Sequence, residues 1–111
     1  MSDRELLELA AKAAGISGQF TEQMPEAGYP RYCCGIGYLA MWNPLTDDGD
    51  ALRLAVQCLI TIEPWWTDIT YAQWTTEDGL QCAAEKHGAD KFAATRRAIT
   101  RAAAEIGRAI P

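Results

Sequence analysis

The pattern of apolar and polar positions predicts three helices and one run of short strands. Apolar residues recur at helical spacing in three stretches, so we expect helices over residues 3–14, 47–58 and 91–109. Alternation with a period of two runs through residues 59–84 and predicts an antiparallel meander. Residues 15–34, which are rich in glycine and proline, predict a long irregular loop, followed by a short strand over 35–41.

The chain is organised around the segment that leads into the second helix. Pro44 prevents a helix from running through this point, and Thr46 or Asp47 can cap the helix that follows. Behind the acids of the first turn, four apolar residues at i, i+3, i+4 and i+7 predict one buried stripe: Leu52, Ala55, Val56 and Leu59. The acids themselves do not form a calcium loop, because the glycine and glutamate that such a loop requires are missing.

Apolar residues occupy both faces of the expected strands, which favours helices on both sides of the sheet. We therefore predict an α+β fold built as a three-layer α/β/α sandwich. In this fold a small, mostly antiparallel sheet of three or four strands is covered by about three helices. A chain of 111 residues is the size of one domain, so we expect a single domain over 1–111.

Charge and composition narrow the class of protein. The net charge is −5, with −6 on residues 31–90 and +4 on residues 91–111. An acidic body disfavours broad nucleic-acid binding, which relies on neutralising phosphates. Charged residues interrupt the apolar positions at the N-terminus, and no apolar run reaches the ~18–20 residues of a membrane helix. We expect a cytoplasmic protein with free thiols.

The cysteines and the single histidine give no recognisable catalytic or metal motif. The four cysteines include adjacent Cys33 and Cys34, and no C-x-x-C pair occurs. Either of these two thiols could pair with His87 in a thiol-dependent enzyme, but no local motif surrounds them. We therefore predict a protein that is not an enzyme and that holds neither a metal nor a cofactor.

The aromatic residues are the strongest indication of a binding surface. Trp65 and Trp66 are adjacent in an expected turn, so both can hardly point into the core. An exposed indole is a common anchor for a protein partner. We expect this pair, together with Tyr29 and Tyr32 of the long loop, to contact a protein partner or a second copy of the chain.

A small-ligand site is the alternative. Tryptophans would stack on a nucleotide base, while Arg97, Arg101 or Arg31 would neutralise its phosphates. The same arginines of the last helix could instead form an exposed face that pairs with carboxylates of the acidic body.

Two segments, residues 43–54 and 94–107, resemble a family of small bacteriophage and prophage proteins, the phage ABA sandwich domain. With the meander between them, the resemblance covers well over half of the chain and leaves out residues 16–41 and 64–66. It implies a sheet layered between helices and a phage or prophage origin, where a host factor, including a defence component, would be a natural partner. The family carries no established activity, so the resemblance assigns no functional residues.

Overall fold

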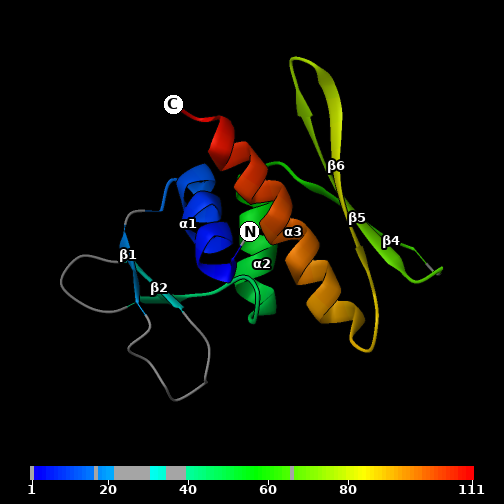
Figure 1. Ribbon diagram of the computed structural model, residues 1–111, viewed down its shortest axis with the longest axis horizontal. Coiled ribbons are helices and arrows are strands. Elements are labelled where there is room, and N and C mark those ends of the chain that lie inside the picture. The colour runs from blue at the N-terminus through cyan, green and yellow to red at the C-terminus, as the bar shows by residue number, and fades with distance from the viewer. Residues whose placement is uncertain (1, 17, 22–30, 35–39, 66) are drawn as a thin grey trace.

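The computed structural model describes residues 2–16, 18–21, 31–34, 40–65 and 67–111, and this part of the chain forms three helices and two antiparallel sheets of three strands (Figure 1). The elements follow one another as α1 (Asp3–Ala14), β1 (Gly18–Thr21), β2 (Arg31–Cys34), β3 (Ala40–Trp42), α2 (Asp48–Gln57), β4 (Thr61–Trp65), β5 (Ile69–Thr76), β6 (Gly79–Lys86) and α3 (Lys91–Ala109).

Side-chain caps fix where the three helices begin. The hydroxyl of Ser2 accepts a hydrogen bond from the backbone N–H of Glu5 at 3.2 Å, and the carboxylate of Asp47 accepts one from Asp50 at 2.8 Å. Asp90 caps α3 in the same way, through the N–H groups of the second and third helical residues. These bonds satisfy N–H groups that have no partner within the helix. Each helix starts and ends within one residue of its predicted range.

Helix α2 ends in a Schellman motif. The N–H of Ile60 donates to the carbonyl of Ala55 at 2.8 Å, and the N–H of Leu59 donates to the carbonyl of Val56 at 3.3 Å. This motif requires a left-handed residue just past the helix, a position that glycine usually fills. Here Leu59 occupies it with a φ of 57°.

Strands β4, β5 and β6 form a sheet in the order β4-β5-β6, with β5 in the centre. Ala72 of β5 is opposite Ile62 and Ala83 and is fully buried. The prediction of a turn at residues 64–67 is wrong in part, because Pro64 and Trp65 belong to β4. An edge strand tolerates a proline, since its missing N–H need not contribute to the ladder.

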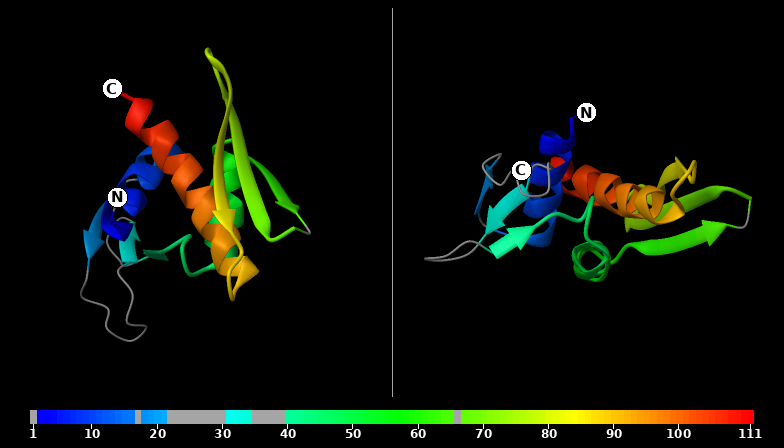
Figure 2. Two further views of the ribbon diagram at one scale, coloured as in Figure 1. Left: turned by 45° about the vertical axis from the view of Figure 1, so that its right-hand side comes forward. Right: turned by 90° about the horizontal axis from the view of Figure 1, so that it is seen from below.

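Helix α3 is the middle layer of the molecule and lies between α1 and the β4–β6 sheet (Figures 1 and 2). The two helices approach closely at Gly107, where an added Cβ atom would lie 2.0 Å from the carbonyl oxygen of Leu9. Small side chains on α3 permit this approach and also the packing on the sheet, since Ala98, Ala102 and Ala103 are all fully buried.

The predicted α+β class, with three helices and a three-stranded antiparallel sheet, is confirmed. The order of the layers is sheet, α3 and α1, so the helices that we expected on both sides of the sheet lie on one side (Figure 2). The opposite face of the sheet leaves Leu80 65% exposed and Cys82 exposed. The apolar residues of that face are therefore part of the molecular surface rather than a second covered layer.

The other sheet has the order β1-β2-β3 and lies beyond α1 (Figure 1). Residue 18 is opposite residue 34 in the first pair of strands, and residue 32 is opposite residue 42 in the second. The prediction of an irregular loop over 15–34 is therefore wrong at both of its strands. Of the strand predicted over 35–41, residues 35–39 lie outside the described part, and β3 begins at Ala40.

Candidate functional site

Five large apolar side chains are exposed around α2, β4 and the start of α3, and we call this group the apolar surface. They are Leu52, Val56, Leu59, Trp65 and Phe92, with exposures of 59, 68, 84, 48 and 62%. Single exposed apolar residues are ordinary in proteins, whereas large groups of them are typical of surfaces that contact another molecule.

A groove of about 560 Å³ opens between α2, β4 and α3, beside three residues of the apolar surface. Leu52, Trp65 and Phe92 line this groove, together with Ile62 of β4 and Ile99 of α3. Its lining is largely apolar, and charged residues such as Asp48, Lys91 and Arg96 also border it. Such a groove suits an apolar side chain with polar groups around it.

The buried face of α2 is opposite to the face on which the sequence predicts the buried stripe. Ala51, Leu54 and Ala55 are each only 2% exposed and face the core, whereas Leu52 and Val56 face solvent. Both sets have helical spacing, and the larger residues of the predicted stripe would have buried more apolar area. The prediction is therefore wrong for Leu52, Val56 and Leu59, and Ala55 alone is buried as expected.

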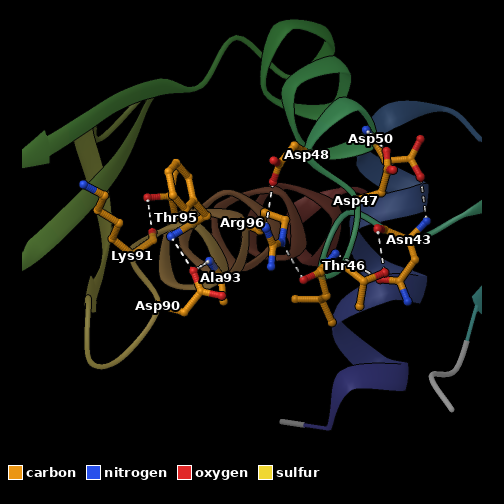
Figure 3. Close-up of polar contacts among 12 residues, drawn as sticks. Asn43, Thr46, Asp47, Asp48, Asp50, Asp90, Lys91, Ala93, Thr95 and Arg96 are labelled. Carbon is orange, nitrogen blue, oxygen red and sulfur yellow. Dashed lines mark hydrogen bonds and ion pairs between the residues drawn. The ribbon is translucent and has the colours of Figure 1, made fainter. Parts of the chain in front are cut away.

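Polar contacts at the start of α2 fix its rotation (Figure 3). The backbone N–H of Asn43 donates to the carboxylate of Asp50 at 2.9 Å, which ties the first turn to the segment before it. From α3, the guanidinium of Arg96 donates to the carbonyl of Leu45 at 2.9 Å and to the carboxylate of Asp48 at 2.7 Å. The Arg96 side chain is 17% exposed, and charge-assisted bonds in such a setting are stronger than neutral ones. Together these bonds hold the face of α2 that carries Leu52 and Val56 outward.

Trp65 is held in place at the edge of the sheet. Its ring lies edge-on to the ring of Tyr71, with centroids 6.3 Å apart and an angle of 81° between the planes. This arrangement is favourable for aromatic pairs and restricts the indole without burying it. Trp65 is thus a half-exposed indole with a restricted orientation next to the groove.

A second pocket, of about 640 Å³, lies between α1, α3 and β6. Trp74, Arg97 and Arg101 line it, so the structure places both predicted arginines beside a tryptophan. Both arginines also have carboxylate partners, because Arg97 bonds to Asp3 at 3.1 Å and Arg101 bonds to Glu85. A phosphate in this pocket would have to compete with those carboxylates.

His87 belongs to a hydrogen-bonded chain that connects β5 with α3. Thr95 donates its hydroxyl hydrogen to the carbonyl of Lys91 at 2.8 Å, so it accepts from Thr70, whose hydroxyl is 2.9 Å away. Thr70 therefore accepts from Nε2–H of His87, at 2.7 Å. The imidazole is a donor here and cannot take the proton of Thr70. Nδ1 lies 3.9 Å from the carboxylate of Asp68.

This direction of donation does not suit a nucleophile and its base. A general base must accept the proton of the nucleophile, and Thr70 is in addition fully buried. Figure 1 places β2, which carries Cys33 and Cys34, beyond α1, whereas β6 and the residues after it lie beyond α3. The backbone therefore does not bring the two cysteines of β2 next to His87.

The structure describes some of the predicted binding residues, and others lie outside its described part. Trp65 lies on the apolar surface, and the two predicted arginines line the second pocket. Tyr29 and Trp66 lie outside the described residues, and so does the side chain of Tyr32 in β2. Sequence reasoning missed Leu52, Val56 and Leu59 as surface residues, because it assigned them to a buried stripe, and it did not single out Phe92 as exposed. The competing spacing of Ala51, Leu54 and Ala55 shows that α2 offered a second stripe, but no local signal chose between the two.

Within the described residues, no group of three or more histidine, cysteine, aspartate or glutamate side chains is placed to hold a metal ion. None of the described helices is both long enough and apolar enough to cross a membrane. Comparison of the chain with protein-family models, with curated proteins and with solved structures gives no match.

Proposed function

We propose that this chain is a non-catalytic binding protein whose apolar surface recognises another protein. The observation that carries this proposal is the group of five exposed apolar side chains, three of which line one groove. Aromatic side chains in well-packed pockets dominate the energy of protein interfaces, and Trp65 and Phe92 are the aromatic members here. A polar rim around an apolar centre is the usual composition of such a surface.

The setting of this binding follows from the resemblance to the phage ABA sandwich domain. We place the protein in the cytoplasm of a bacterial cell that carries a phage or prophage. The partner is then a protein of the phage or of its host, which includes a host defence component and a second copy of the chain. Neither a cofactor nor a metal is part of this proposal.

Photo-crosslinking in the expressing cell tests the proposed surface. A Phe92→p-benzoylphenylalanine variant puts the reactive group at the groove, and a Leu80→p-benzoylphenylalanine variant is the control. Leu80 is similarly exposed, at 65% against 62% for Phe92, but lies on β6 away from the groove. We expect a crosslinked product of discrete mass from position 92 and not from position 80. Equal products, or none, from both positions would refute the proposal.

A nucleotide-binding pocket is the second candidate, and the meeting of Trp74, Arg97 and Arg101 in one pocket favours it. Binding to the folded chain would raise its melting temperature in proportion to the logarithm of ligand concentration. We would measure this shift across a panel of mono-, di- and cyclic nucleotides, in low and high salt. A shift that is lost in Arg101→Gln supports this candidate, and a flat panel rejects it.

A further inference from the structure

We propose that the apolar surface binds a second copy of this chain, and that the C-terminal ends of the two α2 helices meet antiparallel across a two-fold axis near Val56. This inference rests on the proposed function and names the partner of the same surface. A two-fold interface uses one patch on both chains, so the patch must fit itself.

The spacing of the exposed residues on α2 suits a helix pair. Leu52 and Val56 lie at i and i+4 on one face of α2, and Leu59 follows just past its C-terminal end; we call these three exposed residues the α2 seam. At a rise of about 1.5 Å per residue, Leu52 is about 6 Å from Val56, and Leu59 lies on the other side of Val56, beyond the last residue of the helix. When two copies meet antiparallel at Val56, Leu59 of each chain therefore lies next to Leu52 of the other.

Leu52 borders the groove, so this arrangement brings the second copy's Leu59 to the groove entrance. Leu59 is 84% exposed and lies in a left-handed conformation, with a φ of 57°. Leucine is disfavoured in this conformation, and glycine would complete the Schellman motif with less strain. A strained position that presents a large apolar side chain to solvent points to a function for that side chain. In the dimer, each chain supplies one projecting leucine and one groove.

The charges of α2 favour the antiparallel orientation. Asp48 and Asp50 lie in its first turn, and no basic residue lies in its last turn. A parallel pair would place the acidic ends side by side and align the two helix dipoles unfavourably. In an antiparallel pair about Val56, the two acidic ends point away from each other.

The exposed apolar area is that of a small dimer interface. With about 150–250 Å² for each aromatic side chain and about 60–120 Å² for each aliphatic one, the five exposed fractions give roughly 300–550 Å² per chain. Specific interfaces bury about 800 Å² on each partner, and the polar rim of the groove would add to the apolar part. The five side chains therefore supply roughly half of the area that a specific complex requires, and the polar rim supplies the rest.

The edges of the β4–β6 sheet are poor alternatives for self-association. Pro64 interrupts the N–H pattern of the β4 edge. On the other edge, the carbonyl of Ala84 in β6 accepts a hydrogen bond from Arg101 at 3.0 Å. Pairing of this sheet with the sheet of another copy is thus hindered on both sides, whereas the α2 seam is open.

Sedimentation velocity from micromolar to millimolar protein tests the dimer. We expect the natural chain to sediment as a dimer, and Val56→Glu and Val56→Lys each to raise the dissociation constant at least about 100-fold, because like charges would face each other at the axis. An equimolar mixture of the two variants should form a heterodimer, since opposite charges then meet. The control Leu80→Glu, on β6, should leave the dissociation constant unchanged.

Leu59→Gly separates an interface role from a structural one. Its φ suits glycine, so we expect an unchanged or higher melting temperature together with a dissociation constant raised about tenfold or more. A natural chain that is monomeric throughout, or a dimer that tolerates both Val56 variants, overturns this inference. If position 92 crosslinks to a different protein only, the dimer is rejected while the proposed function stands.

Discussion

Replacing Gly107 by alanine tests how closely the two long helices must approach. Gly107 is buried in α3 and faces the backbone of α1. An added Cβ atom would lie 2.0 Å from the carbonyl oxygen of Leu9, 2.8 Å from its carbonyl carbon and 3.3 Å from the backbone nitrogen of Ala13. The atoms in the way belong to backbone, so they cannot rotate aside as a flexible side chain would.

The expected cost follows from two opposing effects. Ordinary contacts between carbon and oxygen are about 3.3–3.6 Å long, so α1 and α3 would have to separate by more than about 1 Å. Such overpacking costs about 1–3 kcal/mol and more where both sides are rigid. Alanine recovers about 1 kcal/mol of helix propensity relative to glycine. Because rigid backbone faces the new methyl group on both sides, we take an overpacking cost of about 2–4 kcal/mol, and we expect Gly107→Ala to lower the free energy of unfolding by roughly 1–3 kcal/mol.

Urea unfolding followed by circular dichroism measures this loss. With a slope of about 1–3 kcal/mol per molar urea, the midpoint should fall by about 1 M while the slope stays constant. Gly49→Ala is the matched control, because Gly49 is also helical but an added Cβ would meet only the ends of the Arg53 and Asp47 side chains, at 3.1 and 3.2 Å. The control should be neutral or slightly stabilising. A Gly107→Ala protein as stable as the natural chain would refute the close contact between the helices.

Three further predictions concern the hydroxyl of Thr70 and the thiol of Cys58. Thr70→Val should lower the free energy of unfolding by about 1–3 kcal/mol, because His87 and Thr95 lose their shared hydrogen-bond partner. Thr75→Val, at an exposed position of the same strand, should change this free energy little. Equal effects of the two substitutions in urea unfolding would contradict the prediction. Burial raises the pKa of the Cys58 thiol, so at mildly alkaline pH iodoacetamide should modify Cys58 more slowly than exposed Cys82, as peptide mass spectrometry can measure. The stability contributed by the neutral Cys58 thiol is complete below the pKa that this thiol has in the unfolded chain, and it is lost as the pH rises through the pKa of the thiol in the folded chain. A Cys58→Ala protein should therefore lose less stability in alkali than the natural chain. The same dependence of stability on pH in both proteins would count against this prediction.

The helices and the meander are set by local signals, which is why the sequence predicts them. Ser2, Asp47 and Asp90 each precede an apolar periodic stretch and cap it in the structure. Alternation in residues 59–84 likewise predicts strands, and the two faces of β5 and of β6 differ in burial. Such patterns depend on neighbours within a few residues, so no knowledge of the tertiary structure is needed.

The exposed face of α2 could not be derived in the same way. Two interleaved stripes on this helix have apolar spacing, and hydrophobicity alone favours the one with the larger residues. The choice is made by Arg96, which bonds to Leu45 across 51 positions of sequence and clamps the start of the helix to α3. Strands β1 and β2 present a similar problem, because their pairing is set by contacts that no local period reveals.

The distribution of small and large apolar residues connects the fold to its proposed assembly. The fully buried core of the described residues is rich in alanine, including Ala10, Ala72 and Ala98, while several of the larger apolar residues lie on the surface. Small residues inside bring the helices and the sheet close together, but they bury little apolar area per side chain. The larger residues outside hold apolar area that can be buried only when something covers it. Association through the α2 seam would therefore supply stability that a single chain lacks, and the folded chain and its dimer would be linked by mass action.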